Sequence, residues 1–283
     1  MKKIRYAHKD YELSSLPATR KDEFFDIYRH NFSYVLKAGS LLLLFGLPLL
    51  ALVLFMDIGN VGINPSVYDE ETLYNGKLMW DIILHGGVLV GLVFFLFGFA
   101  GVSRILHLLI YQEGISFWHD FFRGVKENFV PMLLQSLWLM VLYAGSYAVC
   151  TLVAPFILGI GLSIIFVLLP LPIYVWSIAS IGVYETKFFE HTKNGLFFAF
   201  RNILWTLPFL LLGLLPFFAY YLPFNSYLYA IIKFAVFALL MLFYYPGLFL
   251  IGSLFAQERF DRFINKEHYP EAYRQGLYEE GRQ

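Results

Sequence analysis

The chain has 283 residues, of which 59% are hydrophobic and 15% are charged, and its mean hydropathy is +0.62. Soluble domains are roughly 45–50% apolar, so this composition excludes a water-soluble enzyme. Lys plus Arg and Asp plus Glu both number 21, and the resulting net charge of zero excludes a nucleic-acid-binding protein that works through an overall basic surface.

Long stretches without ionisable side chains predict transmembrane helices. Residues 38–56 contain no Asp, Glu, Lys, Arg or His, and residues 82–102 contain only His85. Each run is close to the ~20 residues that cross a hydrocarbon core of ~30 Å. These two runs predict the first and second spans.

Two further apolar runs are each too long for one crossing. Residues 129–184 contain no ionisable side chain, and residues 202–256 contain only Lys233. At ~1.5 Å per residue each run would be more than twice as long as a bilayer core is thick, so each is expected to form a helical hairpin. We place the turns near Ala154-Pro155 and at residues 220–225.

The sequence therefore predicts an all-α, polytopic membrane protein that forms a single integral membrane domain over residues 1–283. The expected segments are an amphipathic N-terminus (1–32), spans at about 33–56, 80–103, 129–153, 156–181, 202–221 and 226–254, and a tail (257–283).

The distribution of Lys and Arg predicts that both termini face the cytoplasm. Positively charged segments tend to stay inside, and 18 of the 21 basic residues fall in the two terminal segments and in the connections 103–128 and 185–201. The connection 57–79 is acidic instead, with Lys77 as its one basic residue. The expected topology is N-in, C-in, with six crossings.

A short motif recurs along the chain. Residues 23–32 (EFFDIYRHNF) and 120–129 (DFFRGVKENF) both read acid-Phe-Phe-x-x-x-base-x-Asn-Phe, and residues 196–202 (LFFAFRN) carry a looser version. The motif precedes the first, third and fifth predicted spans. The chain is therefore interpreted as three repeats, each a cytoplasmic amphipathic helix followed by a helical hairpin.

The motif residues are candidates for a cytoplasmic docking or interfacial surface. They are Phe121, Phe122, Arg123, Lys126, Asn128, Arg29, Asn31, Arg201 and Asn202. Two interpretations stay open. In one, these helices bind a cytoplasmic partner or anionic lipid; in the other, they lie in the headgroup region and set the angle of the following span.

Residues 100–110 (AGVSRILHLLI), the Glu113-Gly114 pair and residues 117–129 (FWHDFFRGVKENF) together resemble the YesL-like family of bacterial membrane proteins. The resemblance covers roughly residues 85–265. It implies a multi-pass protein of the bacterial plasma membrane that is associated with carbohydrate uptake systems and sugar-responsive sensor kinases. Its partners would then be the lipid bilayer and a transporter subunit or sensor kinase, and not nucleic acid.

A few polar side chains inside the predicted spans form a candidate intramembrane site. Asp81 and His85 are spaced i, i+4, so they share one helical face, and Gln135 lies in the third predicted span. Such groups relay protons or bind substrate hydroxyls in some membrane proteins. In the alternative interpretation, Asp81 is a carboxylate at a helix end and His85 packs against a neighbouring helix.

The sequence contains no pattern that points to catalysis or to a cofactor. Ser146, Ser163, Ser177 and Cys150 lie in apolar stretches without a GxSxG turn, and no Cys/His cluster has the spacing of a zinc site. We therefore expect a protein that is not an enzyme and has no metal or cofactor, and that acts as an accessory or regulator of carbohydrate uptake or sensing. The alternative is a small-molecule permease, for which Asp81, His85 and Gln135 are the residues to test.

Overall fold

The computed structural model describes residues 16–62, 70–152, 161–162, 165, 168–220 and 227–278, and every regular element in these ranges is helical. The elements are α1 (Arg20–His30), α2 (Phe32–Gly62), α3 (Glu70–Ile110), α4 (Phe117–Leu152), α6 (Pro170–Val183), α7 (Phe188–Arg201), α8 (Ile203–Tyr220), α9 (Tyr227–Leu239), α10 (Tyr245–Phe260) and α11 (Lys266–His268). Two π-helical turns, η2 (Leu240–Tyr244) and η3 (Asp261–Asn265), join α9, α10 and α11 into one continuous helical run.

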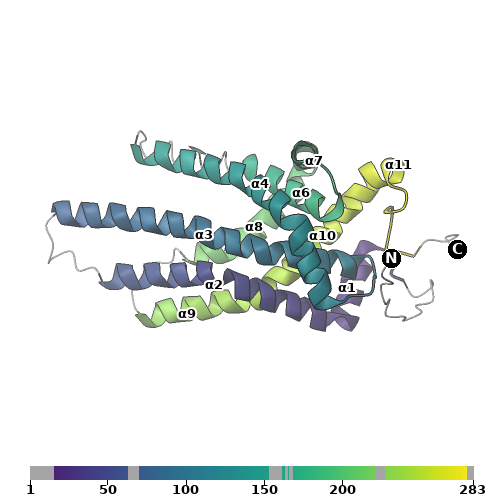
Figure 1. Ribbon diagram of the computed structural model, residues 1–283, viewed down its shortest axis with the longest axis horizontal. Coiled ribbons are helices and arrows are strands. Elements are labelled where there is room, and N and C mark those ends of the chain that lie inside the picture. The colour runs from purple at the N-terminus through teal and green to yellow at the C-terminus, as the bar shows by residue number, and fades with distance from the viewer. Residues whose placement is uncertain are drawn as a thin grey trace.

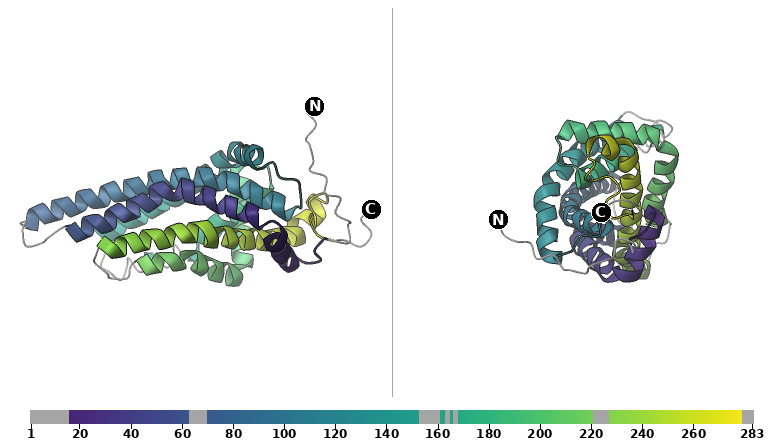
Figure 2. Two further views of the ribbon diagram at one scale, coloured as in Figure 1. Left: turned by 90° about the horizontal axis from the view of Figure 1, so that it is seen from below. Right: turned by 90° about the vertical axis from the view of Figure 1, so that its right-hand side faces the viewer.

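The long helices form an elongated bundle. Figure 1 shows α2, α3, α4 and α9 running along the long axis, with α7 lying across it. The two ends of the described chain meet at one end of the bundle, where the Tyr278 N–H donates to the Pro17 carbonyl at 3.0 Å. Seen from that end, the C-terminal segment lies among the ends of the other helices (Figure 2, right).

Local sequence explains where several helices begin and end. The Thr19 hydroxyl accepts a hydrogen bond from the Asp22 N–H and caps α1, and Pro170 occupies the first position of α6, where its missing N–H is not needed. Asn31 and Asn202 end α1 and α7 with nearly the same backbone geometry, φ −121° with ψ 17° and φ −121° with ψ 25°. Two of the three motif copies thus form a separate helix that stops at the motif asparagine.

The prediction of a separate amphipathic helix before the third span is wrong. Residues Phe117–Leu152 form one helix, α4, which runs through the second copy of the motif without a break. Here Asn128 does not end a helix. Its side-chain amide points to α3 and donates to the Ala100 carbonyl at 3.4 Å and the Ser103 hydroxyl at 3.3 Å. Close packing of the start of α4 against α3 keeps this segment in line with the rest of α4.

The helices are longer than several of the predicted spans. The connection 57–79 was expected to be an acidic loop, but α2 continues to Gly62 and α3 begins at Glu70. At ~1.5 Å per residue, the 41 residues of α3 extend well beyond a ~30 Å hydrocarbon core. The expected turn at Ala154-Pro155 and most of the turn at 220–225 lie outside the described residues.

By length and composition, four described helical stretches can cross a membrane. They are Phe32–Leu52, Gly86–Ile110, Phe117–Ser146 and Tyr227–His268. A fifth is obtained if α7 and the following Ile203–Leu215, which are bent by 101° from each other, count as one broken span. The fourth predicted span, 156–181, corresponds to α6, which has 14 residues, fewer than the ~20 a crossing needs. The predicted beginning of that span lies mostly outside the described residues.

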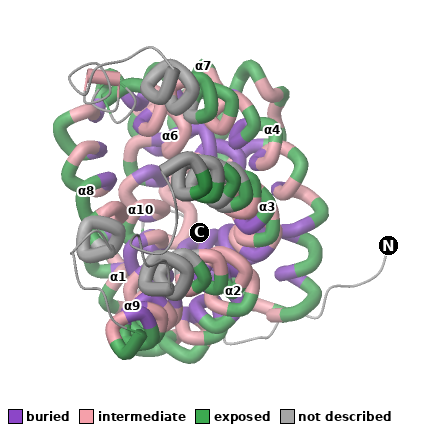
Figure 3. The backbone as a smooth tube through the Cα atoms, turned by 90° about the vertical axis from the view of Figure 1, so that its left-hand side faces the viewer, coloured by how far each residue is buried: buried purple, intermediate pink, exposed green. Residues whose placement is uncertain are grey.

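Large apolar side chains cover the outside of the bundle. The outer faces of α4, α8 and α9 are largely exposed (Figure 3). They carry Val130, Leu134, Leu137 and Val141 on α4, Leu204, Leu211 and Leu215 on α8, and Leu228, Ile231, Ile232 and Val236 on α9. Contiguous exposed apolar surface on this scale is not found on soluble monomers. It is compatible with a membrane-embedded protein.

Small residues allow the closest helix contacts. Gly101 of α3 lies against the ring of Phe121, and a Cβ added at Gly124 of α4 would come within 2.7 Å of the Arg104 Cβ. Glycine at such crossings lets helix backbones approach, which is the main source of packing energy between helices in lipid. The contact between α3 and α4 therefore depends on these two glycines.

We predict that Gly101→Ala destabilises the protein and that Gly145→Ala does not. The added methyl group at position 101 collides with the Phe121 ring, and overpacking of this kind costs about 1–3 kcal/mol, whereas a Cβ at position 145 meets nothing within 4 Å and alanine is the better helix former by up to about 1 kcal/mol. The measurement is the apparent melting temperature of the detergent-solubilised variants. Equal responses of the two variants would show that α3 and α4 do not cross at Gly101.

Candidate functional site

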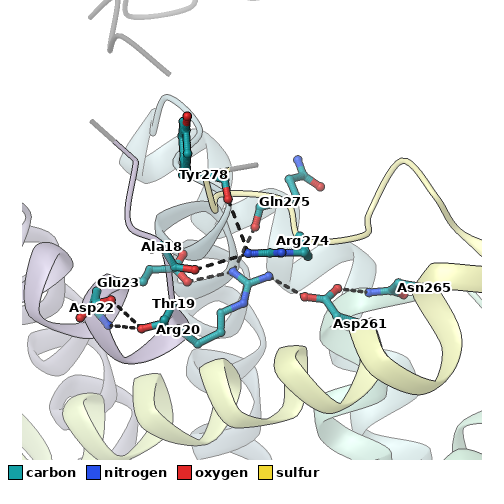
Figure 4. A network of polar contacts seen from close by, with 10 residues as sticks. All are labelled: Ala18, Thr19, Arg20, Asp22, Glu23, Asp261, Asn265, Arg274, Gln275 and Tyr278. Atoms are coloured by element: carbon teal, nitrogen blue, oxygen red, sulfur yellow. Dashed lines mark hydrogen bonds and ion pairs between the residues drawn. The ribbon is translucent and has the colours of Figure 1, made fainter. Parts of the chain in front are cut away.

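A buried arginine connects the two ends of the described chain (Figure 4). Arg20, in the first turn of α1, places Nη1 2.8 Å from the Glu23 carboxylate and Nη2 2.8 Å from the Asp261 carboxylate. The three side chains are between 0% and 8% exposed. Because an unpaired charge is costly in such a position, the guanidinium and the two carboxylates require one another.

The network continues into the C-terminal helix and α6. Asp261 and Asn265 are the first and last residues of the π-helical turn η3, and the Asn265 amide donates to Asp261 at 2.7 Å. The Tyr184 hydroxyl, at the end of α6, donates to Asn265 at 2.6 Å. Burial is the main cause of a raised pKa at Tyr184, so this hydroxyl keeps its proton and acts as a donor. The network thus joins α1, η3 and the end of α6.

The segment after α11 closes over this network. Arg20 Nη1 also donates to the Gln275 carbonyl at 3.0 Å, and the Gln275 side chain donates to Glu113 at 3.0 Å. The next residue, Gly276, has φ +84°, and a Cβ there would collide with the Ile110 carbonyl. Both the positive φ and the close approach to the Ile110 carbonyl require glycine at this position. The C-terminal segment is therefore held in place by backbone geometry as well as by hydrogen bonds.

Two carboxylates share one guanidinium in this network, so one carboxylate is poorly compensated. Burial raises the pKa of Glu23 to about 7, an effect that the neighbouring Arg20 opposes and Asp261 reinforces. One oxygen of Glu23, Oε1, also has no hydrogen-bond partner among the described residues. Glu23 therefore changes its charge near neutral pH.

Two cavities lie next to each other in the same half of the bundle. An apolar cavity of about 350 Å³ lies among α3, α4, α6, α8 and α10, and its wall includes Phe99, Trp176 and Phe249. A polar cavity of about 500 Å³ lies between α3, α4 and the connection from α6 to α7. His107 of α3 lines both cavities. The bundle thus offers two half-open cavities that share His107, one apolar and one polar.

Gln135 connects α4 to α7. Its side chain is fully buried; the amide nitrogen donates to the Phe188 carbonyl at 3.1 Å and the Thr192 hydroxyl at 2.9 Å, and its oxygen accepts from Trp138 at 2.9 Å. These bonds use Gln135 to hold the start of α7 against α4. It does not line either cavity.

Gln135 of α4 lies at some distance along the bundle from the backbone of Asp81 in α3. Asp81 and His85 belong to α3, and their side chains lie outside the described part of the chain. Because α3 and α4 run antiparallel with Asn128 beside Ala100, Gln135 lies level with a point on α3 that is about 12 residues, or about 18 Å, from Asp81. The role of the pair Asp81 and His85 stays a prediction.

The motif residues divide into exposed and buried groups. Exposed residues are Phe122, Arg123 and Lys126 on α4, Arg29 on α1 and Arg201 on α7; buried or partly buried residues are Phe121, Asn128, Asn202 and Asn31. The Phe121 ring packs between α3 and α4 at 1% exposure, and Asn202 bonds the Phe198 carbonyl of its own helix at 3.2 Å. Only the exposed group can meet a partner or lipid.

Sequence reasoning missed the residues that dominate the two polar sites. Arg20 contributes to the basic N-terminal segment, Glu23 opens the first copy of the motif, and His107 lies within residues 100–110. The sequence assigns neither these three residues nor Asp261 to a site. No local spacing joins Arg20 to Asp261, which are 241 positions apart. For His107 a signal exists in the sequence, since it lies within a run that is otherwise apolar from Ile105 to Ile110.

The fold defines a helical bundle whose long apolar helices are compatible with a membrane-embedded protein. Comparison of the chain with models of protein families, with curated proteins and with solved structures gave no match. Functional conclusions therefore rest on the residues and geometry of this chain.

We predict that stability falls as the pH rises through about 7, and that Glu23→Gln reduces this fall. The folded pKa of Glu23 lies above its ordinary value of 4.5, so the stabilisation is complete below about pH 4.5 and is lost as Glu23 ionises near pH 7. At ~1.4 kcal/mol for each pKa unit, the effect is at most about 3 kcal/mol. Melting temperatures in detergent between pH 5 and 8.5 measure it.

The control is Glu258→Gln, which neutralises an exposed carboxylate of α10. It should follow the pH profile of the unmodified protein. If the melting temperatures of the Glu23 variant and of the unmodified protein depend on pH in the same way, Glu23 is not the group with the raised pKa.

Proposed function

We propose that the chain is a polytopic, N-in and C-in protein of the bacterial plasma membrane that works without catalysis, as an accessory or regulator of a solute uptake or sensing system. The six spans predicted from the sequence are part of this proposal, and so are the three repeats, the second of them without a separate amphipathic helix. The resemblance noted above makes a carbohydrate system the first one to test. A transporter subunit or a sensor kinase is the expected partner.

The observation that carries the proposal is an exposed aromatic and basic surface at the end of the bundle where both termini lie. On α4, Phe122 is 58% exposed beside the exposed Arg123 and Lys126. On α1, Phe25 is 60% exposed and lies one turn from Arg29. Aromatic and arginine side chains are the residues that contribute most to protein–protein contacts.

A rigid base supports this surface. The Arg20 network fixes α1 against η3 and the C-terminal segment, and Gln135 fixes α7 against α4. On α7, the exposed Arg201 stacks on the ring of Phe263 with its guanidinium carbon 4.0 Å from the centroid. A surface built on fixed helices loses little conformational entropy on binding, which favours docking.

The second candidate function is a small-molecule permease with its site between the helices. The adjoining cavities at His107 favour it, because transporters commonly bind their substrates at the interface between helical units. In that case the cavities, and not the cytoplasmic surface, would be the working part of the protein.

We predict that the triple variant Phe122→Ala, Arg123→Ala, Lys126→Ala lowers recovery of the partner in mild-detergent purification by at least about tenfold. Truncation of a residue that dominates an interface costs about 2 kcal/mol or more, and arginine is over-represented among such residues. The partner is scored as an identified transporter subunit or sensor kinase. The matched control is the double variant Met79→Ala, Ile83→Ala, which removes exposed apolar side chains from the first half of α3.

The result that would contradict the proposal is specific. If the unmodified protein recovers no such partner, and the purified chain alone moves a solute across liposome membranes, the permease is the correct function.

A further inference from the structure

The apolar cavity has the size and lining of a ligand site. Its volume of about 350 Å³ is within the range of ~300–1,000 Å³ found for small-molecule sites, which are mostly apolar with a few polar groups. It has room for about twelve groups of the size of a water molecule at ~30 Å³ each. An unbranched chain of about that many methylenes would fill it.

The polar cavity next to the apolar one is lined by charged side chains. Glu113, Glu127 and Glu185 line it together with one guanidinium, Arg104. Glu127 is already paired with Arg104 Nη1 at 2.5 Å and with Arg123 Nε at 2.7 Å. The three carboxylates still outnumber these two guanidinium groups, which leaves an excess of negative charge. An anionic group is therefore disfavoured in this cavity.

Hydrogen-bond donors accompany these acceptors. Arg104 Nε is buried and has no partner in the described part of the chain. The Thr186 hydroxyl, 3.3 Å from His191 Nε2, also lines the cavity, as does Asn128, whose N–H groups already bond to Ala100 and Ser103. An ammonium group would use only the carboxylates, whereas hydroxyl groups donate and accept. The mixed lining matches a neutral group that carries several hydroxyls.

His107 lies at the junction of the two cavities. Its side chain is 7% exposed, and its Nδ1 has no hydrogen-bond partner among the residues that the structure describes. A Cβ at Gly182 would collide with the imidazole, so glycine makes room for the ring at this position. An unpaired polar atom in a buried site is destabilising, and a ligand that bonds to the imidazole removes that cost.

We propose that the two cavities form one site for a neutral single-chain amphiphile with a hydroxyl-rich head, of the monoacylglycerol or alkyl glycoside class. The chain lies among α3, α4, α6, α8 and α10, the head lies beside Arg104 and Glu185, and the atoms that join chain and head bond to the imidazole of His107. This inference goes beyond the proposed regulatory function and does not depend on the docking surface.

Photo-crosslinking tests the site on the purified full-length chain in phosphatidylcholine nanodiscs. The probe is a monoacylglycerol with a diazirine in the middle of its chain, and labelled peptides are mapped by mass spectrometry. We expect saturable labelling of the peptides that contain Phe95, Phe99 and Trp176, which line the apolar cavity. Unlabelled monoacylglycerol or alkyl glucoside should displace the probe, and a fatty acid or alkyltrimethylammonium of equal chain length should displace it much less.

Variants separate the site from general lipid contact. His107→Ala should weaken probe binding about three- to tenfold through loss of one hydrogen bond, while His119→Ala, which removes an exposed histidine at the start of α4, should have no effect. Glu185→Lys changes an exposed residue and reverses one charge in the head site. It should make the fatty acid a better competitor.

Three results would overturn the proposal. They are labelling that does not saturate, equal displacement by charged and neutral amphiphiles on the unmodified protein, and equal binding by the His107 and His119 variants. The displacement series needs no variant, so it decides the matter even if His107→Ala does not fold. Failure to recover a partner in the docking experiment leaves these results unchanged, because they are measured on the chain alone.

Discussion

The buried charge of Arg20 has to be neutralised by neighbouring side chains. This requirement determines how the helices pack at the end of the bundle where the two ends of the described chain meet. Its guanidinium lies between Glu23 of its own helix and Asp261, and it also holds the Gln275 carbonyl. A buried ion pair is often no more stabilising than a well-packed apolar pair, but removal of one partner is strongly destabilising. The network therefore specifies one arrangement of the two chain ends and fixes α1 across the entry to α2.

The rest of the bundle obeys a different constraint. Apolar side chains cover its outside, so burial of apolar surface from water does not hold the helices together within lipid. Close contacts do so instead. Gly101 and Gly124 let α3 and α4 approach, and Gln135 and Tyr184 supply hydrogen bonds between helices. Polar groups are thus concentrated between the helices, where the two cavities also lie.

Much of the helical layout follows from the sequence, because apolar run length and Lys/Arg placement are local properties. The ends of α1 and α7 at Asn31 and Asn202 coincide with the recurring motif. The continuous α4 could not be predicted, since it depends on the packing of Gly124, within the second copy of the motif, against α3. The residues of the two polar sites were harder to predict from the sequence. Arg20 and Asp261 meet through tertiary structure alone, and neither Phe121 nor Phe122 carries a sequence signal that tells which one is buried.

The central claim is that the end of the bundle with the Arg20 network and the exposed aromatic and basic side chains faces the cytoplasm. Cysteine labelling in intact cells tests it most directly, after Cys150, the single cysteine, is replaced by Ala. Gly76→Cys lies in α3 where an added Cβ meets nothing within 4 Å, and Lys21→Cys lies at an exposed position of α1. A membrane-impermeant maleimide should label position 76 in intact cells and position 21 only after permeabilisation. Labelling of position 21 in intact cells, with position 76 protected, would contradict the account.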